Sequence, residues 1–176
     1  MKLIILDPDG VINYDSNIFT KTPNEWRPIP GSLEAIAHLT QAGYRVVVAS
    51  NQSCGRKVMD MSTFNAINDK MYKAVIQAGG RIDAIFFSPY SNAENRNYCK
   101  SVILMFEEIA QRFSTDLKDV PTIGAVLRYL QAAEAVGAAP TMVLTGKGKK
   151  TRTASGLPKS TRIFADLAAV VDTLTK

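Results

Sequence analysis

Cysteine and histidine are scarce in this chain of 176 residues, which has two cysteines and one histidine. Cys54 and Cys99 form neither a CxxC pair nor a Cys/His pair with the spacing of metal ligands. No disulfide framework or zinc-finger motif is therefore present, and we expect two reduced thiols. His38 falls within a predicted helix, away from the strand ends where ligands bind in α/β proteins. We expect it at the surface, which excludes a Ser-His or Cys-His mechanism.

Long hydrophobic runs are also absent. No apolar stretch approaches the roughly 20 residues that a membrane-spanning helix needs. The first residues offer only four apolar side chains between Lys2 and Asp7, too few for a secretory signal. With 46% hydrophobic and 21% charged residues, the composition is typical of a soluble globular protein. We expect one domain over residues 1–176, cytoplasmic, monomeric and without membrane contact.

Acidic residues are missing from one stretch near the C-terminus, and this explains the formal net charge of +5. Six basic residues lie in that stretch: Lys147, Lys149, Lys150, Arg152, Lys159 and Arg162. The rest of the chain carries 15 basic and 16 acidic residues. A nucleic-acid-binding protein spreads its basic residues over a face. We therefore expect no nucleic-acid partner, and a loop that is either solvated or reaches over a phosphate-sized ligand.

Short, mostly apolar runs alternate with amphipathic stretches along the chain. The runs predict strands over 3–6, 45–49, 84–87, 121–124, 141–144 and 162–164. Helices are expected from Gly31-Ser32 to Gly43, after a cap at Ser62, along the face formed by Ile103, Phe106, Ile109 and Phe113, and over 127–136 and 167–174. Strands that are apolar throughout and alternate with helices predict a doubly wound parallel sheet covered on both faces.

Four segments lack a regular pattern: 8–30, 50–60, 88–100 and 145–160. All but part of the last follow the C-terminal end of a predicted strand. Ligands of open α/β sheets bind at that end. We therefore expect the functional site in these segments.

The first strand ends in two carboxylates, Asp7 and Asp9, followed by Gly10. Such a pair can act on a phosphate ester: one carboxylate attacks phosphorus, and the other protonates the leaving oxygen and then activates water. One magnesium ion could be shared by the Asp7 carboxylate and the Asp9 backbone carbonyl. Taken alone, the motif favours a turn with Asx hydrogen bonds. The context reverses that preference, because the second strand ends in Ser50 and Asn51, whose hydroxyl and amide groups are suited to holding phosphoryl oxygens.

These residues resemble the haloacid dehalogenase superfamily of phosphatases, and within it the capless branch of heptose-bisphosphate and histidinol-phosphate phosphatases. The resemblance runs nearly end to end through five segments: Asp7-Pro8-Asp9-Gly10-Val11-Ile12-Asn13, residues 22–31, Ser50-Asn51-Gln52-Ser53, Leu130-Gln131-Ala132-Ala133 and Leu144-Thr145-Gly146-Lys147-Gly148. It implies hydrolysis of a small phosphomonoester, with Asp7 as nucleophile, Asp9 as acid and base, and magnesium held by both. Ser50 would contact the phosphoryl group, and the implied substrate contacts are Asn51, Gln52, Ser53, Cys99 and Lys147.

Lys100 is the implied cation that stabilises the transferring phosphoryl group, but it matches only by register. The family has C-R-K-P-x-P-G-M where this chain has Tyr98-Cys99-Lys100-Ser101-Val102-Ile103-Leu104-Met105. An ordinary surface lysine before a helix is an equally good interpretation.

The site departs from the family at several positions. Where the family has G-D-S-L-R-D, with the last magnesium carboxylate, the chain has Gly124-Ala125-Val126-Leu127-Arg128-Tyr129. The family's zinc ligands fall on Ser88, Tyr90, Arg96 and Tyr98, which form no zinc site. Pro8 replaces the arginine between the carboxylates, and the loop after Ser53 becomes Cys54-Gly55-Arg56-Lys57-Val58. We therefore expect weak magnesium binding, no zinc and much reduced phosphatase activity.

An alternative follows from the apolar character of these replacements. The phosphatase scaffold would be repurposed or engineered around an apolar pocket, either to bind a small molecule or to form a Schiff base. A lysine in an apolar cleft loses its proton more readily and can then attack a carbonyl carbon. Lys100, and after it Lys57, are the candidates. The glycine- and lysine-rich run after Leu144 lacks the spacing of a phosphate-binding P-loop and predicts a solvated loop.

Overall fold

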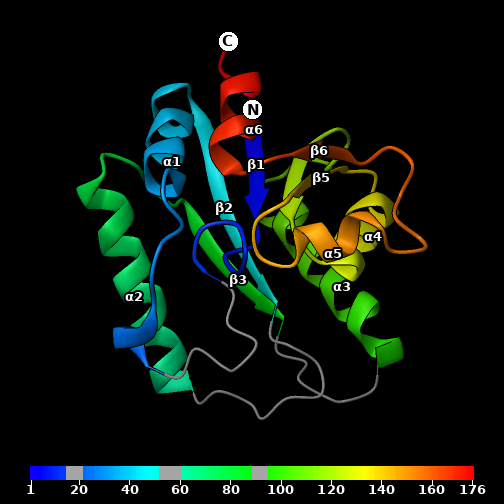
Figure 1. Ribbon diagram of the computed structural model, residues 1–176, viewed down its shortest axis with the longest axis horizontal. Coiled ribbons are helices and arrows are strands. Elements are labelled where there is room, and N and C mark those ends of the chain that lie inside the picture. Colours follow the sequence, from blue (N-terminus) through cyan, green and yellow to red (C-terminus); the bar gives the residue numbers. More distant parts are fainter. Residues whose placement is uncertain (15–21, 52–60, 89–94) are drawn as a thin grey trace.

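The part of the chain that the structure describes is organised around one parallel sheet of six strands (Figure 1). The computed structural model describes residues 1–14, 22–51, 61–88 and 95–176, with the backbone alone at 51 and 95–99. The strands are β1 (Lys2–Leu6), β2 (Tyr44–Asn51), β3 (Ala84–Ser88), β4 (Pro121–Gly124), β5 (Ala139–Val143) and β6 (Arg162–Phe164). Their order in the sheet is β3-β2-β1-β4-β5-β6. The predicted doubly wound α/β fold is confirmed.

Helices cover both faces of the sheet because its strands are apolar on both sides. The helices are α1 (Ser32–Gln41), α2 (Met61–Gln77), α3 (Asn95–Arg112), α4 (Leu127–Ala135), α5 (Gly148–Arg152) and α6 (Leu167–Leu174), with a 3₁₀ turn over Pro23–Glu25. Residues of α1, α2 and α6 share one hydrophobic core, and residues of α3 and α4 share the other, as Figure 1 shows on the two sides of the sheet. Among the described residues, no helix is long and apolar enough to span a bilayer.

Strand β1 lies at the centre of the sheet and contributes to both cores. Ile4 and Leu6 are buried with α1 and α6, whereas Leu3 and Ile5 are buried with α3 and α4. The chain winds from β1 towards β3 on one side and from β4 towards β6 on the other. The direction of winding therefore changes between β1 and β4, and a doubly wound sheet opens a crevice at that point.

The expected cap of α2 is wrong, whereas the expected start of α1 at Gly31-Ser32 is confirmed. Helix α2 begins at Met61, so Ser62 lies in its first turn and is not its cap. Gly31 is the N-cap of α1, with no side-chain cap, and the Ser32 hydroxyl donates to the Ile12 carbonyl instead, at 2.7 Å. Both serines match a local capping pattern, but Ser32 bonds to a loop that is distant in sequence.

Two segments expected to be irregular are partly helical. Helix α3 begins at Asn95, inside the segment 88–100, and α5 lies inside 145–160. Helix α5 carries no apolar stripe, because its residues are Gly, Lys and Thr with one Arg. A tertiary contact supports it: the Thr151 hydroxyl donates to the Ala125 carbonyl at 2.7 Å. Hydrophobic periodicity could not predict a helix of this kind.

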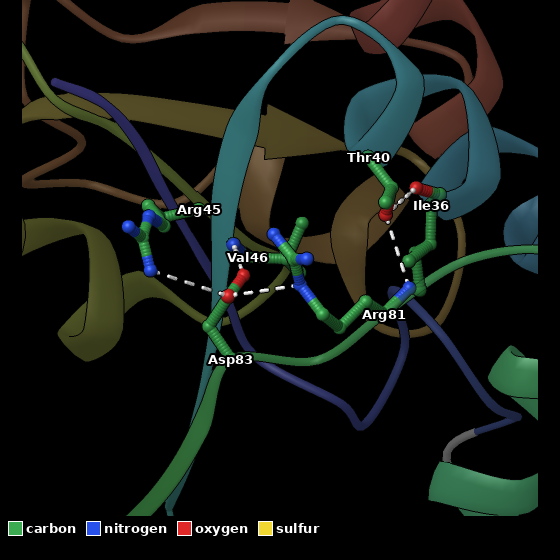
Figure 2. Close-up of polar contacts among 6 residues, drawn as sticks. All are labelled: Ile36, Thr40, Arg45, Val46, Arg81 and Asp83. Atoms are coloured by element: carbon green, nitrogen blue, oxygen red, sulfur yellow. Dashed lines mark hydrogen bonds and ion pairs between the residues drawn. The ribbon is translucent and has the colours of Figure 1, made fainter.

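A cluster around Asp83 joins α1, β2 and the start of β3 (Figure 2). The Val46 N–H donates to Asp83 Oδ2 at 2.8 Å, and Arg81 Nε lies 3.0 Å from Asp83 Oδ1. The Arg81 N–H donates to Thr40 Oγ1, whose hydroxyl donates to the Ile36 carbonyl. The cluster lies at the N-terminal side of β3, so it holds the end of the sheet opposite the expected site.

Replacing Asp83 with alanine is expected to lower the free energy of unfolding by about 2 kcal/mol, because the buried Val46 N–H loses its acceptor. Arg81, and Arg45, whose Nη1 lies 3.8 Å from Asp83 Oδ1, add little, since both side chains are more than half exposed. Urea denaturation measures the loss. The matched control Asp83→Asn keeps an oxygen acceptor and is expected to lose less. Equal losses in the two variants would contradict this account.

Candidate active site

Asp7 and Asp9 lie where β1 leaves the sheet, at the point where the winding direction changes. Asp7 is 3% exposed, and its backbone N–H donates to the Ile123 carbonyl of β4 at 3.0 Å. That hydrogen bond fixes the position of Asp7 beside β4, one residue beyond the pairing of Leu6 with Val48 of β2. The first predicted carboxylate therefore lies between β2 and β4, at the crevice of the sheet.

The loop after Asp7 closes tightly on itself. The backbone N–H groups of Val11, Ile12 and Asn13 all donate to the Pro8 carbonyl, at 3.3, 2.9 and 3.0 Å. Gly10 has a φ of 82°, a conformation that glycine adopts at little cost. Asn13 Nδ2 donates to Asp9 Oδ1 at 3.0 Å and so orients the half-buried Asp9 carboxylate. The loop is thus a hydrogen-bonded turn that also presents a carboxylate.

The basic loop after β5 packs against this turn. The Thr145 hydroxyl donates to the Gly10 carbonyl at 2.5 Å. A Cβ atom at Gly146, where φ is +58°, would lie 2.6 Å from Gly10 Cα, so only glycine fits the contact. Lys147 follows as the N-cap residue of α5 and is half-buried. The contact brings the predicted substrate residue Lys147 to the carboxylate loop; its substrate role remains a prediction.

The end of β2 supplies Ser50, which is 7% exposed and pairs with Phe87 of β3. Asn51 ends the strand, and its side chain lies outside the described part of the structure. Gln52, Ser53, Cys54 and Lys57 lie outside it as well. The structure therefore places one of the predicted phosphoryl contacts, Ser50, on the strand beside β1.

The end of β4 is apolar and closely packed. Ala125 is 1% exposed, and Val126 is the half-buried N-cap residue of α4. Tyr129 is fully buried, its ring contacts Phe106 edge-on at 5.2 Å, and its hydroxyl donates to the Ala49 carbonyl at 3.0 Å. None of the residues 125–129 that follow β4 is acidic.

The donor set suits magnesium only in part. Magnesium prefers oxygen ligands and uses one or two carboxylates together with phosphate and water. Asp7 and Asp9 can supply the protein oxygens of such a set. Within the described residues, no group of three or more His, Cys, Asp or Glu side chains could hold a metal ion. A third carboxylate is thus not available among those residues.

The end of β3 is tied to α3 by a hydrogen bond between the hydroxyls of Ser88 and Ser101. Ser88, which the resemblance aligns with a zinc ligand of the family, is buried. Tyr90 lies outside the described residues, and the side chains of Arg96, Tyr98 and Cys99 do as well. The absence of zinc stays a prediction.

The Lys100 side chain is exposed on α3. Schiff-base chemistry requires a lysine shielded from water, so the structure gives that hypothesis no support at Lys100. Its predicted role as a phosphoryl-stabilising cation is not settled by this exposure. His38, also expected at the surface, is exposed on α1 as predicted.

Sequence reasoning missed two contributors to this site, Asn13 and Thr145. The hydrogen bond from Asn13 to Asp9 joins two side chains four residues apart, a contact that no local turn pattern predicts. Thr145 joins Gly10 across 135 positions, and no local pattern predicts that contact.

Known proteins of similar sequence are phosphatases of one kind. The chain is 51% identical over 175 residues to a D-glycero-beta-D-manno-heptose-1,7-bisphosphate 7-phosphatase of Bordetella bronchiseptica, covering 99% of this chain and 98% of that protein. An enzyme of the same name from Neisseria meningitidis serogroup A is 48% identical over 170 residues, covering 95% and 91%. The chain matches no protein-family model.

Solved structures give the same result. A crystal structure of D,D-heptose 1,7-bisphosphate phosphatase from B. bronchiseptica, complexed with magnesium and phosphate, superposes with a TM-score of 0.92 at 51% identity, covering 99% of this chain and 98% of that one. The corresponding phosphatase from Burkholderia thailandensis gives a TM-score of 0.79 at 49% identity, with both chains covered in full.

Proposed function

We propose, from the premise that the chain belongs to the D-glycero-D-manno-heptose-1,7-bisphosphate 7-phosphatase family of haloacid dehalogenase-like phosphatases, that it hydrolyses a sugar phosphomonoester through an aspartyl phosphate. The resemblance predicted from the sequence is confirmed at the level of the family. The observation that carries the proposal is the pair Asp7 and Asp9 at the crevice, with Asp9 oriented by Asn13.

The reaction needs two displacements at phosphorus. In the first, a carboxylate oxygen of Asp7 forms a bond to phosphorus while the ester P–O bond breaks, and Asp9 gives its proton to the leaving sugar oxygen. In the second, water attacks the phosphorus, Asp9 takes the proton of that water, and the bond between phosphorus and Asp7 breaks. Inorganic phosphate leaves and both carboxylates return to their starting states. Ser50 would donate a hydrogen bond to a phosphoryl oxygen.

Magnesium would be held by the Asp7 carboxylate and the Asp9 backbone carbonyl, and when bound it would neutralise charge on the phosphoryl oxygens. The donor oxygens fit this ion, but Ala125 contributes no further carboxylate. The affinity for magnesium, and with it the rate, is expected to be lower than in a site with three carboxylates.

The test is the release of inorganic phosphate from D-glycero-D-manno-heptose 1,7-bisphosphate over a range of magnesium concentrations. We expect slow release that keeps rising with magnesium at millimolar concentrations, because one carboxylate and one backbone carbonyl hold the ion loosely. Release that is the same in EDTA would contradict the proposed role of magnesium. No release at any concentration would contradict hydrolysis itself.

A second candidate function is binding of the sugar phosphate without turnover. The fully buried Ala125 and Tyr129 favour it, because they leave the end of β4 packed and apolar. Calorimetry distinguishes the two: a heptose bisphosphate that binds and is recovered intact supports the binder, whereas release of phosphate supports the enzyme.

A further inference from the structure

The backbone N–H and C=O groups at the end of β1 alternate between its two neighbouring strands, β4 and β2. The Asp7 N–H donates to Ile123 of β4, so the main chain of Asp7 faces β4. Successive residues of a strand direct their N–H and C=O groups to opposite sides, so position 8 faces β2. Leu6 pairs with Val48. If the ladder continued by one step, the N–H of residue 8 would donate to the Ala49 carbonyl.

Residue 8 is proline, which has no N–H. The Ala49 carbonyl is buried, and a buried carbonyl without a donor is costly. The Tyr129 hydroxyl supplies a donor at 3.0 Å, reaching from α4 across 80 positions in sequence. Its ring fits closely beneath the sheet, because a Cβ atom at Gly124 would lie 2.6 Å from Tyr129 Cδ1.

We propose that Tyr129 is a positioning residue: its hydroxyl replaces the hydrogen bond that Pro8 cannot make and so holds the end of β2, with Ser50, beside Asp7. Positions 8 and 129, which both depart from the family pattern, are then linked: the hydrogen-bond donor missing at Pro8 is supplied by the hydroxyl of Tyr129. The role of Ser50 rests on the proposed function, whereas the exchange of donors rests on the hydrogen bonds alone.

The experiment is a double-mutant cycle with Tyr129→Phe and Pro8→Ala. Tyr129→Phe keeps the ring and its contact with Phe106 but removes the donor, and Pro8→Ala restores an N–H. Amide hydrogen exchange at Ala49, Ser50 and Asn51 reports how firmly the strand end is held. We expect Tyr129→Phe to speed this exchange up to about tenfold in the Pro8 background, the value of one hydrogen bond. In the Pro8→Ala background the same change should have little effect.

The matched control is Tyr44→Phe, which removes a hydroxyl at the other end of β2. Its effect should not depend on the residue at position 8. Equal acceleration by Tyr129→Phe in both backgrounds, or no acceleration in either, would overturn the inference.

Binding of inorganic phosphate in the presence of magnesium gives the second readout. Tyr129→Phe should weaken it in parallel with the faster exchange, and Pro8→Ala should rescue it. If exchange at the strand end changes while phosphate affinity does not, the contact is structural only and the positioning role is overturned. If the unaltered chain binds no phosphate, the proposed function fails, and the exchange cycle alone still decides whether Tyr129 replaces the donor missing at Pro8.

Discussion

Replacing Asp7 with asparagine is expected to abolish phosphate release, reducing kcat by at least about 10³-fold. The amide that results has nearly the same shape as the carboxylate but is a poor nucleophile, so the bond between residue 7 and phosphorus does not form. Asp7 is buried, and its backbone N–H donates a hydrogen bond to β4. The substitution leaves that hydrogen bond in place. The fold should therefore survive, and an unchanged circular dichroism spectrum would show that the loss is chemical.

Asp9→Asn is the matched control for this prediction. It leaves the nucleophile intact and removes the acid and base, with an expected loss of about 10²–10⁴-fold. A phosphorylated protein should then be trapped after brief incubation with substrate, because the second displacement is slowed. Phosphate release that is equal in Asp7→Asn and in the unaltered chain would refute the aspartyl phosphate mechanism.

Ala125→Asp is expected to tighten magnesium binding by about tenfold or more, since a further charged oxygen ligand is worth at least about 1.4 kcal/mol at such a site. Ala125 follows β4, the strand to which Asp7 is hydrogen-bonded, so a carboxylate there lies on the neighbouring strand at the crevice. The Thr151 hydroxyl bonds to the backbone carbonyl of Ala125, which the substitution keeps. Phosphate release at limiting magnesium should rise with the affinity.

The stability of this variant gives an independent measurement. Without metal, Ala125→Asp should lower the melting temperature, because it buries a carboxylate at a position that is now 1% exposed and that follows the strand hydrogen-bonded to Asp7. Magnesium should restore the loss, because a ligand that binds only the folded state stabilises it. Ala125→Asn has the same size without the charge and should show little response to magnesium. An equal response in both variants would contradict a metal site at the end of β4.

Much of the fold was predictable from local pattern. The apolar runs predicted the six strands of the described residues to within two residues at both ends, as with 141–144 against β5 (Ala139–Val143). The ends differ because hydrogen bonds to neighbouring strands set them, and β5 begins where Ala139 pairs with Pro121. The start of α3 at Asn95 was missed, because the first turns of a helix can lack the apolar stripe that signals it.

The sequence by itself determined that two carboxylates follow the central strand; that Ala125 stands where a third would be is implied by the resemblance to the family. The sequence could determine the carboxylate pair because motif spacing and strand periodicity are properties of neighbouring residues. Only the tertiary structure decided which distant residues these segments contact: Thr145 bonds to Gly10, and Tyr129 bonds to Ala49 beside Pro8. These contacts join residues 135 and 80 positions apart, and they arise because parallel strands bring distant chain segments together at one edge of the sheet.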